Sequence, residues 1–164
     1  MWSRSVSSEL DTDQQVNMDD KQASNCLSEN VCFALYTAGN ALVRAYRPLL
    51  DECGLTYPQY LVMQALWLND GVSLTQLSLA TRLDLGTLTP IVKRLEVKGF
   101  LNRRIDTEDE RKKVIQTTSE GLTLKQEALA LKQVLLSKVS LNEAEIESLR
   151  DLCMTLIDDL NNKE

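Results

Sequence analysis

Residues 73–118 read SLTQLSLATRLDLGTLTPIVKRLEVKGFLNRRIDTEDERKKVIQTT, and this stretch decides the fold. Ser73 and Gln76, three residues apart, fit a capping box that opens a short helix through Leu83. We expect a tight turn over residues 84–86, Asp-Leu-Gly, with a second helix directly after it. The pattern therefore predicts a helix-turn-helix.

The second helix is expected to run to about Lys98, where Gly99 ends it. One face is apolar and another is hydroxylated and basic; the first carries Leu88, Ile91, Val92 and Leu95, the second Thr87, Thr89, Pro90, Lys93 and Arg94. Two β-like runs, residues 100–105 and 113–118, flank a charged tip and predict a hairpin. The expected fold is mainly α with a small β-hairpin wing, a winged helix-turn-helix.

Helices are predicted upstream of this stretch as well. An apolar stripe steps by four and three residues and predicts a helix of about three heptads: Val31, Leu35, Ala38, Leu42, Ala45 and Leu49. Pro48 marks a kink or an early stop in it. The stripe is either core or, equally, a subunit seam. A further helix is expected from about Pro58 to Leu68, and residues 1 to about 27 are expected to form a flexible acidic tail.

Downstream, one helix is expected over about residues 119–137. Ser140 with Glu143 predicts the cap of a last helix. An apolar stripe on that helix is expected to be buried: Ile146, Leu149, Leu152, Cys153, Leu156, Ile157 and Leu160.

Composition and charge limit the classes of function that this chain can have. The 164 residues, 43% hydrophobic and 5% aromatic, suit one largely helical core. The net charge of −6 is uneven, because residues 85–113 hold eight basic and five acidic residues. Four cysteines without a CxxC spacing, and no histidine, exclude an ordinary zinc site and any histidine-dependent triad. No cofactor is expected. No signal peptide or membrane-spanning run is found, so we expect a cytoplasmic protein with free thiols.

The order of elements favours binding to double-stranded DNA. The second helix of a helix-turn-helix enters the major groove, where Arg94 could contact a guanine and Lys93 a phosphate. Thr87 and Thr89 could contact bases or phosphates, and Arg111 at the hairpin tip could reach the minor groove. The alternative is a helical bundle whose basic face is only solvated. The architecture decides between the two, whereas charge alone would not.

Several long segments resemble the MarR family: LTYPQYLVMQALW (55–67), LDLGTLTPIVKRLEVKGFLNRR (83–104) and DTEDERKKVIQTT (106–118). The segment from Asp84 and CFALYTAGNALVRAYRPLL (32–50) look like its organic-hydroperoxide-sensing branch. The resemblance covers about residues 28–135. It implies a homodimer on a pseudo-palindromic operator, with residues 54–118 as the DNA-binding domain and residues 28–53 and 119–162 as the helical dimerisation region.

The DNA-contacting residues expected from this likeness and from the helix faces are Asp84, Gly86, Thr87, Thr89, Pro90, Lys93, Arg94, Arg104 and Arg111. Where the branch usually has serine after the aspartate, this chain has Leu85, which removes one hydroxyl donor.

The resemblance also implies a peroxide-sensing cysteine, Cys32, whose sulfur accepts hydrogen bonds from Tyr46 and Tyr57. Cys32 and Tyr46 are 14 residues apart, about 21 Å along one helix, so the tyrosine would have to come from the partner chain. A thiolate attacks the peroxide and becomes a sulfenic acid, and an apolar neighbour such as Phe33 favours alkyl peroxides. The alternative to a sensing role is that Cys32 is only a small, buried hydrophobic side chain.

Some members of the branch have a resolving cysteine in the long helix after the hairpin, and residues 119–137 contain none. Cys153 or Cys26 could take that role, whereas Cys53 is interpreted as structural. The expected function is a repressor that releases its operator when organic hydroperoxide oxidises Cys32. The alternatives are a regulator gated by a small aromatic or phenolic ligand or by another oxidant, a thiol peroxidase, and a helical scaffold without DNA.

Overall fold

The chain divides into two compact units, Met1–Ala45 and Tyr46–Glu164. The computed structural model describes residues 27, 29–105 and 113–161. The expected tail at residues 1–27 therefore lies almost wholly outside the described residues. Each unit is described by itself.

The first described helix is α2 (Val31–Glu52), which supplies the first unit and continues into the second. Asn30 caps its start, because the Asn30 side-chain oxygen accepts hydrogen bonds from the backbone N–H groups of Cys32 and Phe33, at 2.8 and 3.3 Å. Cys32 thus lies in the first turn of the helix, at the positive end of the helix dipole.

None of the predicted stripe residues of α2 is buried in this chain, and Val31 and Leu42 are 64% and 40% exposed. The buried side chains of the helix, Tyr46 and Leu50, each lie one residue after a stripe position. An early stop at Pro48 is wrong, because α2 continues past it. Pro48 removes one helical hydrogen bond, and the burial of Leu50 accounts for the last turn remaining helical.

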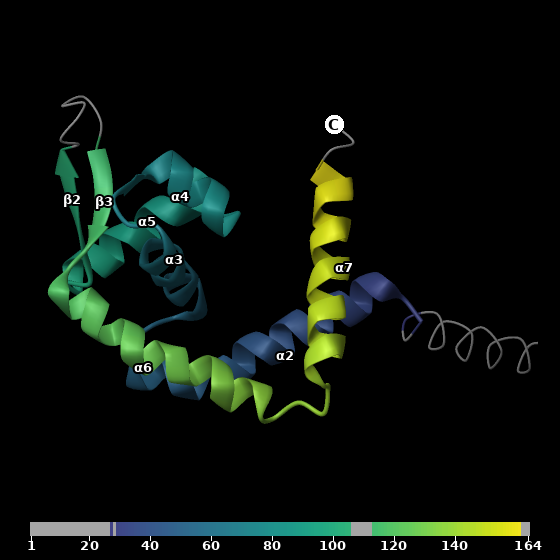
Figure 1. Cartoon of the computed structure of the whole chain (residues 1–164). Helices are drawn as coiled ribbons and strands as arrows, with labels where there is room; N and C mark the ends of the chain where they lie inside the picture. Colours follow the sequence, from purple (N-terminus) through teal and green to yellow (C-terminus); the bar gives the residue numbers. More distant parts are fainter. Residues whose placement is uncertain (1–26, 28, 106–112, 162–164) are drawn as a thin grey trace, which may run out of the picture. The chain divides into compact units, whose positions relative to one another are not determined.

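The second unit is a winged helix-turn-helix followed by two helices (Figure 1). Its elements are α3 (Tyr57–Leu68), β1 (Val72–Ser73), α4 (Leu74–Thr81), α5 (Leu85–Val97), β2 (Leu101–Ile105), β3 (Lys113–Thr117), α6 (Ser119–Leu136) and α7 (Glu143–Asn161). The strands form an antiparallel sheet in the order β1-β3-β2, in which Val72 and Arg103 both face Ile115. The predicted fold class is confirmed. The two-residue strand β1 was not predicted, because it is too short to carry an alternating pattern.

The turn between α4 and α5 lies two residues earlier than predicted. The Ser73 capping box is confirmed, with the Gln76 backbone N–H donating to Ser73 Oγ at 3.2 Å. However, α4 ends before Arg82, which adopts a left-handed backbone with φ of 54°. Asp84 is the N-cap of α5 and accepts a hydrogen bond from the Thr87 backbone N–H at 2.8 Å. The turn predicted at residues 84–86 is therefore wrong.

The core of the second unit lies between α3, α4, α5 and the sheet. The side chains with at most 1% exposure include Leu50, Val62, Met63, Leu66, Leu77, Leu88, Val92, Leu95 and Leu101. The predicted apolar face of α5 is confirmed, since Ile91 is also buried, at 8% exposure. Among the described residues, no helix is long and apolar enough to cross a membrane.

The wing joins α6 through a tight polar junction. Asp70 accepts hydrogen bonds from the Thr117 backbone N–H and hydroxyl, at 2.8 and 3.0 Å. Trp67 Nε1 donates to the Gly121 carbonyl at 2.9 Å. A Cβ at Gly121 would overlap the carbonyl oxygen of Phe100. The close approach of α6 to the base of the wing therefore requires glycine at this position.

The last helix, α7, buries none of its side chains in this chain. The burial predicted for its apolar stripe is therefore wrong for the single chain: Leu152 and Leu160 are each 66% exposed. The predicted Ser140–Glu143 cap is also wrong. Asn142 and Glu145 form the reciprocal cap instead, at 2.8 and 3.0 Å.

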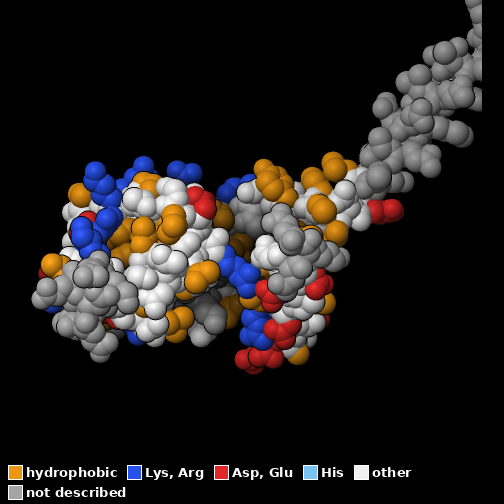
Figure 2. Space-filling view, turned by 90° about the horizontal axis from the view of Figure 1, so that it is seen from above, with side chains coloured by type: hydrophobic (Ala, Val, Ile, Leu, Met, Phe, Trp, Pro, Cys, Tyr) orange, Lys and Arg blue, Asp and Glu red, His pale blue; other side chains and the backbone are white. Residues whose placement is uncertain are grey.

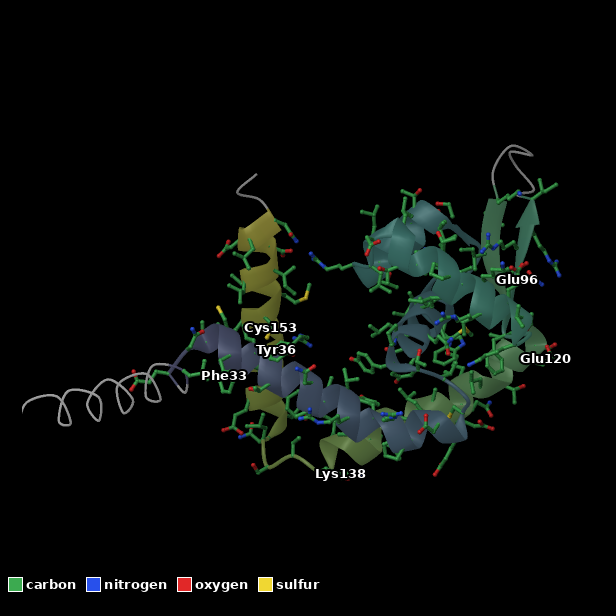
Figure 3. All side chains as sticks on the ribbon, turned by 180° about the vertical axis from the view of Figure 1, so that it is seen from behind. Phe33, Tyr36, Glu96, Glu120, Lys138 and Cys153 are labelled. Atoms are coloured by element: carbon green, nitrogen blue, oxygen red, sulfur yellow. The ribbon has the colours of Figure 1, made fainter. Side chains whose placement is uncertain are left out.

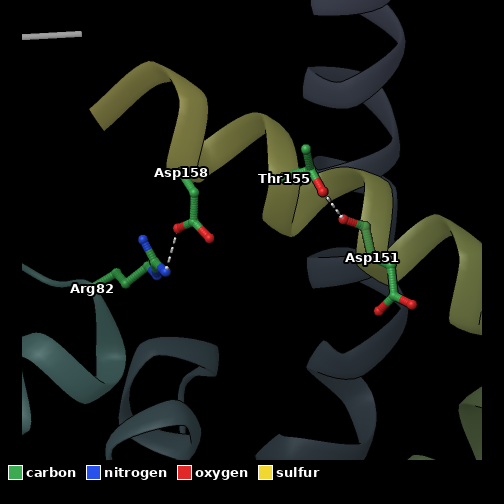
Figure 4. A network of polar contacts seen from close by, with 4 residues as sticks. All are labelled: Arg82, Asp151, Thr155 and Asp158. Atoms are coloured by element: carbon green, nitrogen blue, oxygen red, sulfur yellow. Dashed lines mark hydrogen bonds and ion pairs between the residues drawn. The ribbon is translucent and has the colours of Figure 1, made fainter. Parts of the chain in front are cut away.

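One ion pair ties α7 to the helix-turn-helix (Figure 4). Arg82 Nη2 lies 3.0 Å from Asp158 Oδ1, and both side chains are about half exposed, at 46% and 55%. An exposed pair of this kind contributes only about 0.2–1 kcal/mol to stability. Its position matters more, because it joins the residue at the end of α4 to the last helix.

Candidate nucleic-acid interface and thiol site

The exposed side of α5 carries most of the predicted DNA-contacting residues. Those that are exposed on α5 or at its N-cap are Asp84, Gly86, Thr87, Thr89, Pro90, Lys93 and Arg94. Arg104, on β2, is exposed as well, while Arg111 lies outside the described residues. Figure 2 shows several Lys and Arg side chains along the edge of the winged-helix part, with few Asp and Glu side chains among them; elsewhere in the view most Asp and Glu side chains lie next to other Lys and Arg side chains. The structure thus places eight of the nine predicted residues on the surface, seven of them along one helix and its cap.

The two threonine hydroxyl groups already have partners inside α5. Thr87 Oγ1 donates to Asp84 Oδ2 and Thr89 Oγ1 donates to the Leu85 carbonyl, both at 2.6 Å. Each hydroxyl hydrogen is therefore used within the protein, although the oxygen lone pairs still accept hydrogen bonds. That these threonines contact DNA stays a prediction.

Asp84 caps the N-terminus of α5. The hydrogen bonds from the Thr87 side chain and from the Thr87 backbone N–H lower the pKa of this carboxyl below its ordinary value of 3.8. A carboxylate at a helix N-terminus is also stabilised by the helix dipole. These contacts make Asp84 a residue that positions the helix, and nothing in them requires contact with DNA.

Lys93 and Arg94 are the cations of α5 that remain free for a ligand. Within the described part of the chain, neither makes an ion pair or a side-chain hydrogen bond. Two neighbouring cations are engaged elsewhere. Lys98 Nζ donates to the Gly54 carbonyl and to Gln59 Oε1, and Arg103 pairs with Glu96 at 3.4 Å. No local pattern predicts that Lys98 binds the loop before α3 and the first turn of α3, because its partners lie some 40 residues earlier in the chain.

The described cysteines differ in environment. Cys32 is exposed, whereas Cys53 and Cys153 are half-buried. Burial, followed by the nearby Glu127 and Glu52 carboxylates, raises the pKa of the Cys53 thiol. A raised pKa disfavours the reactive thiolate, in keeping with a structural Cys53. Cys26, the other predicted resolving residue, lies outside the described residues.

The structure brings Tyr46 and Tyr57 together in the second unit and adds Tyr60, which was not predicted. Their ring centroids are 5.4 Å apart for Tyr46 and Tyr57, 5.9 Å for Tyr46 and Tyr60, and 6.4 Å for Tyr57 and Tyr60. Burial, followed by the charges of Tyr60 and Tyr57, raises the pKa of Tyr46 to about 12. Burial also raises the pKa of Tyr57 and of Tyr60. All three phenols therefore keep their protons near neutral pH and can donate hydrogen bonds.

The hydroxyl of Tyr60 has partners, since it accepts from Gln64 Nε2 at 3.0 Å and donates to the Ala128 carbonyl at 3.5 Å. In the described parts of the chain, the hydroxyl groups of Tyr46 and Tyr57 have none. These two are thus the free donors of the cluster. The three-residue spacing from Tyr57 to Tyr60 on one helix was the signal that could have found Tyr60.

Two large apolar side chains are exposed near Cys32 on α2. Phe33, the next residue, is 40% exposed, and Tyr36, one helical turn further, is 71% exposed. Figure 3 shows both side chains on α2. Asn30, which caps this turn, was not singled out from the sequence, although asparagine just before an apolar helical stripe is a typical cap. The described residues contain no cluster of acidic, cysteine or histidine side chains that could hold a metal ion.

Comparison with known proteins places the chain among transcriptional regulators. Residues 44–128 match the family model described as "Transcriptional regulator SarA/Rot". An organic hydroperoxide resistance transcriptional regulator of Bacillus subtilis (strain 168) is 33% identical over 146 residues, which cover 89% of this chain and 99% of the relative. Relatives of this kind are not enzymes, which excludes the thiol peroxidase as an interpretation.

Solved structures agree with the fold. A structure of reduced AbfR bound to DNA is 28% identical, with a TM-score of 0.69, and covers 87% of this chain and 97% of that chain. A structure of Bordetella bronchiseptica BpsR, whose DNA binding is regulated by 6-hydroxynicotinic acid, is 26% identical, with a TM-score of 0.73, and covers 80% of this chain and 95% of that chain.

Proposed function

Because this chain belongs to the SarA/Rot family of transcriptional regulators, among the MarR-type winged-helix proteins, we propose that it is a peroxide-responsive repressor. The reduced protein binds a pseudo-palindromic operator as a homodimer, and organic hydroperoxide releases it by oxidising Cys32. The observation that carries the proposal is the exposed Cys32 in the first turn of α2, in a chain whose Bacillus relative is named for organic hydroperoxide resistance.

The DNA-binding part of the proposal is supported by α5. Its apolar face is buried, its other face is exposed, and Lys93 and Arg94 are free of ion pairs within the described residues. A helix of this kind fits the major groove, where a bidentate arginine–guanine contact contributes about 1–3 kcal/mol of discrimination. The match to a regulator solved with DNA supports the same interpretation.

The dimer is supported by uncovered apolar side chains on both α2 and α7. Most of the predicted stripe of α7 and part of that of α2 are exposed in the single chain. Exposed apolar side chains in a row on a helix are typical of a subunit interface. We propose that the partner chain covers both stripes, as the sequence pattern also allowed.

The sensing site combines groups from two subunits in this proposal. Cys32 and Tyr46 lie on the same helix, 14 residues apart, so the free hydroxyl groups of Tyr46 and Tyr57 would reach the sulfur of the partner chain. Protonated phenols stabilise a thiolate by hydrogen bonding, and the first turn of α2 adds the positive end of a helix dipole.

The proposed reaction conserves atoms and electrons. The Cys32 thiolate attacks the terminal peroxide oxygen, an S–O bond forms, and the O–O bond breaks. The alkoxide takes up a proton and leaves as an alcohol, so the sulfur is oxidised by two electrons and the peroxide is reduced. A second thiol, from Cys153 of the dimer or from a small molecule, then condenses with the sulfenic acid and releases water.

Oxidation must reach the DNA-binding helix, and Arg82–Asp158 is the contact we propose for this step. It joins α7, on the proposed dimer interface, to the residue that ends α4. A 100-fold loss of operator affinity requires oxidation to disfavour the bound form by about 2.7 kcal/mol.

The test is fluorescence anisotropy on DNA containing the operator, before and after one equivalent of an alkyl hydroperoxide. Wild type should lose binding, and Cys32→Ser should keep it. Cys53→Ser is the matched control, since this thiol has a raised pKa and should leave the response intact. Retention of binding by oxidised wild type would reject peroxide sensing and leave DNA binding standing.

A regulator gated by a small aromatic ligand is the second candidate, and the likeness to BpsR favours it. Such a protein would release DNA on adding an aromatic acid such as 6-hydroxynicotinic acid. Cys32→Ser separates the two mechanisms, because it abolishes release by peroxide and leaves release by a ligand unchanged.

A further inference from the structure

The centre of the exposed face of α5 is apolar, which the proposed DNA-binding function does not by itself require. At 100° per residue, the direction opposite the buried side chains is occupied by Gly86, Pro90, Lys93 and Val97. Val97 is 81% exposed. Lys93 is therefore the only charged residue in this central stripe, with apolar side chains one helical turn before and after it.

The flanks of this face offer few polar donors. The hydroxyl hydrogens of Thr87 and Thr89 are bonded to Asp84 and to the Leu85 carbonyl. Leu85, at the first position of the helix, is 47% exposed. Apart from Lys93 and Arg94, the side chains of α5 that face outward can thus read DNA mainly through apolar contact.

Neither Pro90 nor Val97 benefits the isolated fold. Pro90 lies at the sixth position of α5, where a proline removes a helical hydrogen bond and costs up to about 3 kcal/mol. Val97 exposes almost its entire side chain to water, although the neighbouring Lys98 is held against the loop before α3. Both residues are therefore better explained by what the face contacts than by the stability of the helix.

The surface is also hollowed at this place. A groove runs between α5 and the start of α3, and its lining includes Pro90, Lys93, Arg94, Val97, Thr56 and Gln59. Its only cations besides Lys98, which is already bonded, are Lys93 and Arg94. A polyanion with apolar groups in its groove complements this surface, and DNA meets that description through its phosphates and its thymine methyl groups.

We propose that Pro90 and Val97 contact thymine 5-methyl groups in the major groove, on either side of the base pair that Arg94 contacts. This inference rests on the proposed DNA-binding function. Pro90 and Val97 are seven residues apart, which corresponds to about 10.5 Å along the helix, so they cannot share one base pair. Each half-site should therefore contain two separate thymines that contribute through their methyl groups.

The test replaces thymine by uracil, which removes the methyl group and leaves every hydrogen-bonding group in place. The full-length reduced protein is first used to select a binding sequence from a random duplex library. Each thymine of the selected half-site is then changed to uracil in turn, and affinity is measured by anisotropy. Wild type should lose about fourfold in affinity at two thymines, the loss expected for one buried methyl group.

The variants assign each thymine to a residue. Pro90→Ser should lose the sensitivity to uracil at one position, and Val97→Asn at the other. Leu68→Ala is the matched control, because Leu68 is 89% exposed on α3 and lies outside α5, and it should keep both sensitivities. Thermal melts of each variant verify that the fold is intact.

The outcomes distinguish failure of the proposed DNA-binding function from failure of the thymine inference. Failure to select any sequence overturns the proposed DNA-binding function itself. Selection of a sequence whose uracil substitutions have no effect overturns the thymine inference and leaves the regulator standing. Uracil sensitivity that persists in both variants also overturns it, because other residues would then contact the methyl groups.

Discussion

At the scale of single residues, several side chains predicted to face DNA first serve the helix that carries them. Asp84 and Thr87 bond to each other at the start of α5, and Thr89 bonds to the Leu85 carbonyl. These bonds fix the first turn of α5 within the protein itself. Lys93 and Arg94, which the arrangement leaves without partners among the described residues, are the polar side chains of α5 that we propose contact DNA.

The Asp84 cap should make stability depend on pH. Because its pKa is lowered in the folded state, Asp84 contributes stability above its ordinary value of 3.8, and the contribution is lost as the pH falls through the lowered pKa. Asp84→Ala should melt at a lower temperature than wild type at neutral pH. The difference should shrink as the pH falls below about 4.

Asp84→Asn is the matched variant for this measurement, because asparagine still accepts the Thr87 N–H but does not titrate. Its thermal midpoint relative to Asp84→Ala should not change with pH. A constant difference between wild type and Asp84→Ala from pH 3 to 7 would contradict the role of the carboxylate.

Gly121 tests the junction between the wing and α6. Gly121→Ala places a Cβ against the carbonyl oxygen of Phe100 and the methyl group of Thr117. Since backbone atoms cannot move away cheaply, the free energy of unfolding in urea should fall by about 1–3 kcal/mol. Leu122→Ala, at an exposed position of the same turn, should change it far less. Equal losses in the two variants would rule out steric overlap as the cause.

At the scale of elements, α5 combines a core-forming face with a face that its own stability does not explain. The buried face follows directly from apolar residues at helical spacing, Leu88, Ile91, Val92 and Leu95. The position of the turn before it did not follow from the residue types. Asp-Leu-Gly is typical of a turn, yet Asp84 caps the helix and Leu85 and Gly86 are already helical. Capping competes with turn formation for the same residue types, and the cap prevails here.

Pro90 should be replaceable with a gain in stability. Pro90→Ala restores a backbone N–H to α5 and should raise the free energy of unfolding by about 1–3 kcal/mol. The urea midpoint measures this change. Pro58→Ala, near the first position of α3, is the control and should have little effect, because a proline there displaces no helical hydrogen bond. No gain for Pro90→Ala would indicate that the helix is already adapted to its proline.

At the scale of the whole molecule, the described chain leaves apolar surface uncovered on α7. Leu149, Leu152 and Leu160 are at least half exposed. Fully burying one such side chain stabilises by about 1.5–3 kcal/mol. A second chain would bury these leucines, and a two-fold symmetric interface buries the same leucines of both subunits.

Leu152→Glu should therefore dissociate the proposed dimer. Two buried leucines replaced by charges should raise the dimer dissociation constant by about 100-fold or more, as measured by analytical ultracentrifugation. Operator affinity should fall with it, since two half-sites are then no longer bound together. Met154→Glu adds the same charge two residues further along α7, about 200° around the helix and therefore on the opposite face, where it should leave the dimer intact. A Leu152→Glu variant that stays dimeric would place the interface elsewhere.

The sequence by itself determined which elements form and which residues share a face. Helical periodicity, the Ser73 capping box and the glycine after α5 each depend on residues within about one or two turns, so these predictions were confirmed. The existence of the hairpin was equally local, whereas the short strand β1 depends on pairing with a distant segment.

Only the tertiary structure decided what covers each face and which groups meet. Tyr46, Tyr57 and Tyr60 come from two helices, and the Arg82–Asp158 pair spans 76 residues. The same apolar periodicity is core in α5 and exposed in α7, because a pattern specifies a face but not its partner. Burial depends on a second surface from elsewhere in the chain or from another chain. The residues of a helix indicate which face is apolar but do not indicate which surface will cover it.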